Sequence, residues 1–380
     1  MRTMAMPVSI DTARYRWVLR AILPGRRALF TLVFALSSFG LLVLYALSQQ
    51  SYAQLHSNMS SRWHKEYTSP VPGAEDFAHT VADMWRPYIH DADIANYTTK
   101  FGRNYTIDES RRVWDRPLGK DVLILDVDTR LDDPGRGSIM QKLTPRLAGR
   151  LNHYIYALIH GYDYRLIHAP KYWFRHQTWV KVPMMRESLK SYKFVVFLDS
   201  DAIFVEPLVP LEWLMDLWGV KNETTLAAMA IDLDEPSNYD SRGNIMWNTG
   251  FVITQQSQRT DDMFDSWVNC PTDEEFPGCS HWEYSWAHEQ AAFAEYIRYE
   301  YNETDELVPI PSNDANGSPY IPQNATCGGA FVSHYWHSKN QSITDLHELV
   351  AGGLSHELED GRGGDLMFKT FLDEHPFDRR

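Results

Sequence analysis

The 380-residue sequence has a formal net charge of −14 at pH 7, with 44% hydrophobic and 23% charged residues. This composition is typical of a globular protein and excludes a wholly disordered chain, a collagen and a coiled coil. The acidic balance argues against nucleic acid as a partner, because a nucleic-acid binder needs a basic face that displaces counterions.

The first element in chain order is an apolar run, 28–47, that contains no charged residue. At about 1.5 Å per residue it reaches about 30 Å, the thickness of the hydrocarbon core of a bilayer, so it predicts a transmembrane anchor. Six arginines and one acid precede it. By the positive-inside rule, residues 1–27 form a cytosolic tail and the rest of this single-pass type II protein is lumenal. A cleaved signal peptide is the alternative, although the run exceeds the usual length of its apolar core.

Glycosylation sequons are frequent after the anchor. Eight asparagines begin Asn-x-Ser/Thr, namely Asn58, Asn96, Asn104, Asn222, Asn302, Asn316, Asn324 and Asn340. Chance predicts about two, so the excess indicates exposure to the glycosylation machinery of the secretory lumen. Asn316 is the weakest of these sites, because Pro319 follows its Ser318.

The three cysteines exclude a disulfide-dense scaffold, but an oxidising lumen permits one disulfide. Three pairings are open. Cys270 and Cys279 would close a short loop and leave Cys327 unpaired.

Residues 48–117 are polar and are interpreted as a lumenal stem, and a fold-like pattern begins near Asp121. The expected strands cover 122–126, 164–168, 194–199, 227–231 and 250–253, and the expected helices cover 146–160, 182–189 and 288–299. Strands that alternate with helices predict an open α/β sheet. The last thirty residues are rich in glycine and are interpreted as irregular surface.

The most informative strand end is Asp199-Ser200-Asp201, which directly follows the apolar residues 194–198. Ligands of open α/β sheets bind outside the carboxyl ends of the strands. Two carboxylates spaced two residues apart can contribute to a site for Mn²⁺ or Mg²⁺, which favour oxygen ligands. A solvated turn is the alternative interpretation.

Further motifs occur in order along the chain: 179–186 (WVKVPMMR), 248–253 (NTGFVI), 288–293 (HEQAAF) and 331–339 (FVSHYWHSK). Together with Asp199-Ser200-Asp201 they resemble a GT-A glycosyltransferase. More narrowly, the chain is similar to the fungal α-galactosyltransferase/α-mannosyltransferase family, which is related to the plant xyloglucan xylosyltransferases. The similarity runs from about Asn152 to Lys339, roughly half of the chain.

The resemblance implies a Rossmann-like GT-A catalytic domain over 118–380 with a mixed, mostly parallel sheet. It also implies a metal-dependent Golgi enzyme that transfers galactose or mannose with retention of configuration. The donor would be UDP-galactose or GDP-mannose, and the acceptor a glycan on a glycoprotein or polysaccharide. An enzyme of this kind acts alone or as part of a homo- or hetero-oligomer.

The resemblance also assigns the metal site and the residues around the diphosphate. Asp199 and Asp201 match the metal-binding acids, with Ser200 between them at the donor. His334 matches the third ligand, although His337 competes with it. The implied diphosphate and nucleotide contacts are Lys339 and Lys181, respectively.

The remaining assignments concern the sugar. Asn248 and Gly250 match an Asn-x-Gly at the donor sugar, and Glu289 and Gln290 match an acid-amide pair near the anomeric carbon. In this hypothesis the leaving diphosphate accepts the acceptor's proton in a front-face transfer. The aromatic residues at 282, 284 and 286 are interpreted as core residues rather than as a sugar platform.

Two other classes of function compete with this interpretation. One is a haloacid-dehalogenase-like phosphatase, in which Asp199 or Asp126 would be the phosphorylated nucleophile. The other is a non-catalytic glycosyltransferase-fold subunit of a Golgi complex. The retention of all the matched residues favours an active enzyme over the latter.

Overall fold

The computed structural model describes residues 74–130, 143–318 and 328–359. The expected cytosolic tail and anchor lie outside these residues, as do Asn58, Asn324 and Cys327. Among the helices that are described, none is long and apolar enough to cross a membrane.

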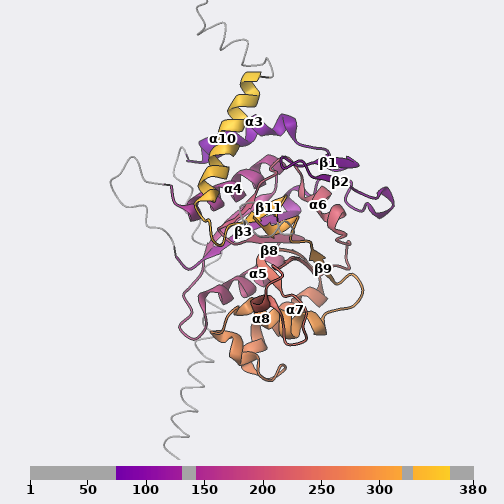
Figure 1. The fold of residues 1–380 in the computed structure, drawn as a ribbon, viewed down its shortest axis with the longest axis vertical. Coiled ribbons are helices and arrows are strands. Elements are labelled where there is room, and N and C mark those ends of the chain that lie inside the picture. The colour runs from indigo at the N-terminus through magenta and orange to yellow at the C-terminus, as the bar shows by residue number, and fades with distance from the viewer. Residues whose placement is uncertain (1–73, 131–142, 319–327, 360–380) are drawn as a thin grey trace, which may run out of the picture. The chain divides into compact units, whose positions relative to one another are not determined.

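A six-stranded sheet forms the centre of the fold (Figure 1). In spatial order its strands are β4 (Asp163–His168), β3 (Val122–Asp128), β5 (Phe194–Leu198), β8 (Trp247–Gln255), β7 (Ala227–Ile231) and β9 (Leu307–Ile310). β3 is parallel to β4 and β5, and β7 is parallel to β9, whereas β8 runs antiparallel to both of its neighbours. The predicted α/β class with a mixed, mostly parallel sheet is therefore confirmed.

The central strands are apolar throughout because both faces of the sheet are covered. Every residue of β5 is buried, and its side chains alternate between two cores. Val196 and Leu198 belong to the core on the side of α4 and α6, and Val195 and Phe197 to the core on the side of α5 and α7. Figure 1 shows these helices on the two sides of the sheet.

The described helices are α3 (Ala74–Trp85), α4 (Pro145–His160), α5 (Lys181–Leu189), α6 (Leu211–Trp218), α7 (Gln258–Asn269), α8 (Glu289–Ala292), a π-helical segment (Phe293–Ile297), α9 (Arg298–Glu300) and α10 (Gln341–Glu359). α4 has strong end signals. The Thr144 side chain accepts a hydrogen bond from the Leu147 N–H, and Gly161 ends the helix with φ of 75°. The single helix expected over 288–299 is instead α8, the π segment and α9 in succession.

Two smaller sheets complete the fold. β10 (Ala315–Gly317), β11 (Val332–His334) and β6 (Ala202–Phe204) form one of them, in that order. β1 (Asn96–Thr98) and β2 (Asn104–Thr106) form an antiparallel hairpin. β6 follows β5 after a short turn, so the three-stranded sheet meets the central sheet at the carboxyl end of β5.

Two expectations about the ends of the folded unit need correction. The described part of the expected stem, 74–117, belongs to the folded unit: Trp114 is buried in the main core and Trp85 packs with α4 and α10. The expected irregular tail is helical as far as Glu359. A Cβ at Gly353 would lie 2.9 Å from Trp85 Nε1, so this glycine lets α10 approach the indole. Gly353 therefore allows α10 to pack closely, although the low helix propensity of glycine favours an irregular structure in the sequence analysis.

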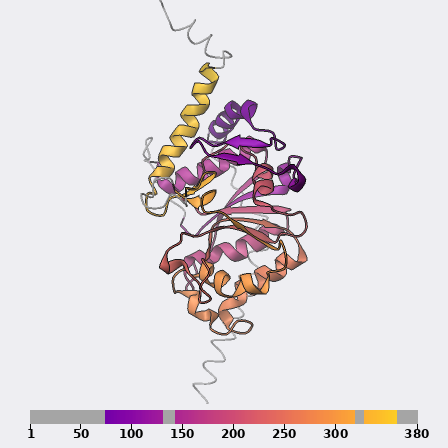
Figure 2. The ribbon, with the colours of Figure 1, turned by 45° about the vertical axis from the view of Figure 1, so that its right-hand side comes forward.

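The segment after α7 is closed by a disulfide between Cys270 and Cys279, as expected. Figure 2 shows this orange part of the chain on the side of the sheet away from the yellow helix α10.

Candidate metal and donor site

The candidate site begins at the turn between β5 and β6, which is Asp199-Ser200-Asp201. The Asp199 N–H donates to the Gly250 carbonyl at 2.8 Å, and the Ala202 N–H donates to the Asp199 carbonyl at 2.8 Å. α4 lies against the turn so closely that a Cβ on Gly149 would be 2.0 Å from the Ser200 carbonyl oxygen. The backbone of the turn is therefore held by contacts that do not use its two carboxylates.

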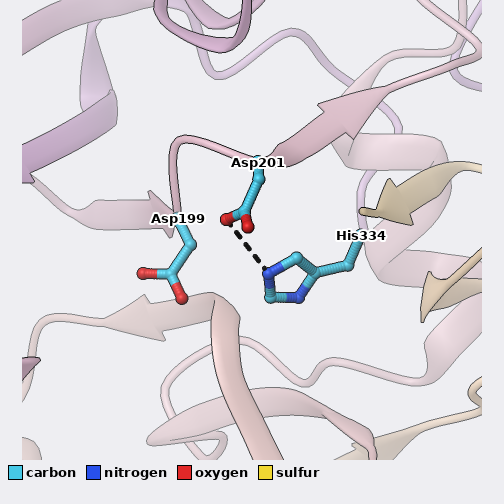
Figure 3. Close-up of side chains that lie close together, drawn as sticks. All are labelled: Asp199, Asp201 and His334. Carbon is cyan, nitrogen blue, oxygen red and sulfur yellow. Dashed lines mark ion pairs between the residues drawn. The ribbon is translucent and has the colours of Figure 1, made fainter. Parts of the chain in front are cut away.

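His334 approaches this turn from β11, which pairs antiparallel with β6 so that His334 lies opposite Ala202. Its Nε2 is 3.3 Å from Asp201 Oδ1 (Figure 3). One ligand atom from each of Asp199, Asp201 and His334 lies within 4.8 Å of the other two. Two carboxylate oxygens and one imidazole nitrogen form a donor set that fits Mn²⁺, and the oxygens also suit Mg²⁺. The fold thus brings the three predicted ligands together, whereas His337 is exposed and lies outside the cluster.

Two residues orient the His334 ring. Asn316 Oδ1 lies 2.7 Å from His334 Nδ1 and can accept its hydrogen bond, so Nε2 is the nitrogen that faces the carboxylates and would ligate a metal. On the other side, a Cβ at Gly250 would be 2.3 Å from His334 Cε1. Gly250, predicted at the donor sugar, thus leaves the space that this imidazole fills.

The structure corrects one predicted glycosylation site. Asn316 is fully buried, with φ of 68°, and its side chain is bound to His334. A glycan cannot be attached to it in the folded chain. The other sequons within the described residues all have exposed asparagines: Asn96, Asn104, Asn222, Asn302 and Asn340. The tripeptide of Asn316 is an ordinary sequon, and in the sequence only Pro319, which follows it, sets this site apart.

Asp201 also binds Lys339, whose side chain donates to Asp201 Oδ2. Burial alone would raise the pKa of Asp201, but His334 and Lys339 more than offset this and hold the pKa well below its usual range. The Lys339 side chain is 59% exposed, so its ammonium group can exchange this carboxylate for another anion. This agrees with the predicted contact between Lys339 and a diphosphate.

Lys181 lies beneath the site and is almost completely buried. Its Nζ lies 3.0 Å from Asp199 Oδ1 and 3.1 Å from Glu289 Oε1. Burial alone would lower the pKa of Lys181, but the two carboxylates outweigh it and raise the pKa above the usual value. A permanently charged ammonium group therefore links a metal ligand to the Glu289 carboxylate.

Glu289 and Thr249 extend this arrangement across β8. The Thr249 hydroxyl donates to Glu289 Oε1 at 3.0 Å, whereas Glu289 Oε2 has no hydrogen-bond partner among the described residues. Burial would raise the pKa of Glu289, but the charge of Lys181 reverses this and lowers it. Glu289 is thus a buried, ionised carboxylate with one oxygen unused.

Gln290 and Asn248 converge on an acid that the sequence analysis did not identify. Asp232 Oδ2 accepts from Gln290 Nε2 at 2.8 Å and from Asn248 Nδ2 at 3.3 Å. Asp232 directly follows β7, as Asp199 follows β5. An acid immediately after an apolar strand was the signal that could have identified it.

The Asp-x-Asp within β3 is fully engaged inside the fold. His153 Nδ1 lies 3.0 Å from Asp126 Oδ1, and the Tyr164 hydroxyl donates to Asp126 Oδ2 at 2.6 Å. The opposite nitrogen of His153 lies 2.6 Å from the Ala202 carbonyl oxygen. Asp126 therefore holds His153 against Ala202, the residue that follows Asp201. It is not available as a phosphatase nucleophile.

Two other expectations are resolved by the fold. Arg186, the last residue of the motif 179–186, binds Asp261 and Asp265 of α7 and takes no part in the site. Tyr284 and Trp286, which were interpreted as core residues, are exposed.

No protein-family model matches the sequence, and no curated protein matches it. The chain is similar to the crystal structure of a glycosyltransferase involved in the glycosylation of the major capsid of PBCV-1, with 14% identity and a TM-score of 0.40 over 60% of this chain and 98% of that chain. It is also similar to the glycosyltransferase GlyE of Streptococcus pneumoniae TIGR4, with 12% identity and a TM-score of 0.35 over 62% of this chain and 64% of that chain. A third match is A197 from STIV, with 12% identity and a TM-score of 0.27 over 50% of this chain and 81% of that chain. Similarities at this level do not support a function for this chain.

Proposed function

We propose that this chain is a metal-dependent glycosyltransferase with a GT-A catalytic domain. In this proposal it transfers galactose or mannose, with retention of configuration, from UDP-galactose or GDP-mannose to a glycan acceptor. The observation that carries the proposal is the cluster of Asp199, Asp201 and His334 at the carboxyl end of β5. Ligands of open α/β sheets bind at such edges.

The donor's diphosphate would lie between this cluster and Lys339. A bound Mn²⁺ or Mg²⁺, held by Asp199, Asp201 and His334, would supply the Lewis acidity that neutralises the departing diphosphate. Lys339 is an exposed point charge that would transfer its hydrogen bond from Asp201 to a phosphate oxygen. Lys181 stays buried and holds Asp199 in place, so its role is to position a ligand rather than to contact nucleotide.

The donor sugar would lie over Asn248, Gln290 and Asp232. These three side chains already share hydrogen bonds. Carboxylate and amide groups in a buried, connected network match the hydroxyl groups of a hexose, which both donate and accept. Asp232 is thus our candidate for reading a sugar hydroxyl that distinguishes the donors.

In the transfer step, the bond between the anomeric carbon and the diphosphate oxygen breaks, and a bond to the acceptor oxygen forms on the same face. The acceptor's proton goes to the departing diphosphate oxygen. Glu289, ionised and held by Lys181, would stabilise the positive charge that develops on the sugar. Its unused Oε2 is the atom available for this role.

The setting that we propose is the Golgi membrane, with an anchor at 28–47 and the catalytic domain in the lumen. The Cys270–Cys279 disulfide and the exposed sequons support an oxidising, glycosylating compartment. The acceptor is then a glycan carried by a glycoprotein or polysaccharide of that compartment.

The test is a donor panel on the full chain, made in a secretory host and purified in detergent. Release of nucleoside diphosphate is measured with UDP-galactose, GDP-mannose, UDP-glucose and UDP-xylose, with Mn²⁺ or with chelator. We expect metal-dependent turnover of one hexose donor.

His334→Ala and His337→Ala are matched variants, because only the first removes a ligand of the cluster. Turnover should be lost in the first and retained in the second. Absence of both turnover and metal-dependent nucleotide binding in the unmodified chain would contradict the proposal and favour a non-catalytic subunit.

A further inference from the structure

Three aromatic side chains project from the loops that precede α5 and α8. Trp173 is 81% exposed, Trp286 71% and Tyr284 59%, which makes them the most exposed large hydrophobic residues within the described ranges. Exposed aromatic residues that gather in one region mark interaction sites more often than chance exposure does. We call these three residues the aromatic surface.

Hydrogen bonds and ring contacts hold the two loops together. The Tyr284 hydroxyl donates to the Trp173 carbonyl at 3.3 Å, and the His176 N–H donates to the Glu283 carbonyl at 2.8 Å. The rings of His176 and His288 stack with centroids 3.6 Å apart. The exposed rings therefore stand on backbone segments that are held in place, as a binding surface requires.

The aromatic surface lies beside the candidate donor site. Trp286 precedes Glu289 by three residues, a span of at most about 11 Å in an extended chain. Glu289 Oε1 in turn lies 3.1 Å from Lys181 Nζ, which contacts Asp199. The surface thus adjoins the carboxylate that we place at the anomeric carbon.

Two buried polar atoms between the aromatic surface and the metal ligands have no hydrogen-bond partner among the described residues: His288 Nδ1 and Glu289 Oε2. Glu289 is only 2% exposed. Buried polar atoms are nearly always paired, and an exception calls for an explanation. These two groups make the region behind the aromatic surface polar, which suits a ligand that carries hydroxyl groups.

The charges near the aromatic surface favour a neutral ligand. Arg175 and Glu283 pair with each other at 3.4 Å. Burial lowers the pKa of His288, which disfavours a positive charge on this imidazole. A pyranose ring fits such a surface because its C–H face packs on aromatic rings while its hydroxyl groups reach polar atoms at the rim.

We propose that Trp173, Tyr284 and Trp286 form the surface that binds a neutral oligosaccharide acceptor and directs its reacting sugar toward Glu289. This inference rests on the proposed function, which makes a glycan the acceptor. It adds where that glycan binds and that the glycan is uncharged.

The experiment compares the full chain with the triple variant Trp173→Ala, Tyr284→Ala and Trp286→Ala. The probes are neutral mannose-, galactose- and glucose-based oligosaccharides. Acceptor KM is measured at saturating donor, and binding is measured separately by isothermal titration calorimetry, which needs neither turnover nor the replaced tryptophans. We expect the triple variant to raise the KM and the Kd of the preferred oligosaccharide about tenfold or more, as truncation of central aromatic contacts does.

The donor side provides the internal control. Donor hydrolysis without acceptor and Mn²⁺ affinity should stay unchanged in the triple variant, because the replaced side chains are exposed. Phe101→Ala is the matched surface variant, since Phe101 is a 40% exposed aromatic residue in the turn between β1 and β2. It should alter none of these quantities.

An acceptor KM and Kd within twofold of the unmodified chain would overturn the inference. Loss of Mn²⁺ affinity or donor hydrolysis in the triple variant would also overturn it, by making the surface a support of the donor site. If the unmodified chain binds an oligosaccharide through these residues but turns over no donor, the proposed function fails and the binding surface stands. No binding of any oligosaccharide, together with altered self-association of the triple variant, would assign the surface to a protein interface instead.

Discussion

β3 and β5 carry the same pattern, an apolar run followed by Asp-x-Asp, and the fold uses the two in opposite ways. In β3 the strand continues through both acids to Asp128, so these side chains meet elements packed on the sheet. Asp126 is taken by His153 and Tyr164, and Arg150 donates to Asp128 at 2.7 Å. In β5 the strand ends before the first acid, and both carboxylates belong to the turn toward β6.

This difference shows that the position of the strand end decides what an Asp-x-Asp does. Acids two residues apart inside a strand point to the same face, here toward α4, and must be neutralised within the fold. Acids in a turn at the sheet edge are able to share one ion, provided that a third ligand arrives from elsewhere. Here His334 arrives from β11 through its pairing with β6.

The largest effect is expected at the turn. Asp201→Asn removes a ligand carboxylate, so turnover should fall about a thousandfold and Mn²⁺ binding should become undetectable by titration calorimetry. Stability at neutral pH should fall modestly, because the lowered pKa of Asp201 means that its ionised form stabilises the fold. Asp115→Asn, at a side chain that is 70% exposed, is the control. If Asp201→Asn retained metal-dependent turnover, the acids after β5 would not be needed for activity, and β3 and β5 would not differ in function.

At β3 the expected effect is on stability instead. Asp126→Ala removes the carboxylate that binds the buried His153 and Tyr164, and a buried polar group left without its partner costs about 1–3 kcal/mol in the free energy of unfolding. Urea denaturation measures this. Mn²⁺ affinity in the folded fraction should stay within about tenfold, since Asp126 acts on the turn only through His153 and the Ala202 carbonyl. If Asp126→Ala unfolds at the same urea concentration as the unmodified chain, the acid of β3 does not stabilise the fold and the contrast with β5 fails.

A smaller effect is expected behind the third ligand. Asn316→Gly removes the acceptor for His334 Nδ1 while glycine tolerates the φ of 68°, so Mn²⁺ affinity should fall about tenfold. The same variant should leave the mass of the enzymatically removable glycans unchanged, whereas Asn302→Gln, at an exposed sequon, should reduce it. A glycan on Asn316 would refute its placement behind His334.

The smallest expected effect is on how the stability of the fold declines at acid pH. Burial would raise the pKa of Asp128, but Arg130 and Arg150 outweigh it and lower the pKa in the folded chain. The ionised carboxylate therefore stabilises the fold above its unfolded pKa of about 3.9, and this contribution is lost as the pH falls through the lower, folded value. Asp128→Asn should flatten the decline of stability below about pH 4 in thermal melts taken across pH. An unchanged decline at acid pH would show that the arginines do not stabilise this carboxylate.

Much of the chain was predictable because its signals are local. The continuous apolar runs of β3 and β5, the Thr144 cap and the Gly161 end of α4 each act within a few residues. The same holds for Asp199 and Asp201 as ligands, because an acid pair directly after a buried strand lies at the sheet edge whatever the topology.

The sequence by itself determined the α/β class, the acid pair after β5 and the order of the motifs, whereas it left the cysteine pairing open. Only the tertiary structure decided that His334 and not His337 faces Asp201 and that Asn316 orients a ligand instead of carrying a glycan. It also decided that Gly149 and Gly250 give space to the turn and to the imidazole. The physical reason is that these properties depend on contacts between residues far apart in the chain, whose distances no local periodicity encodes.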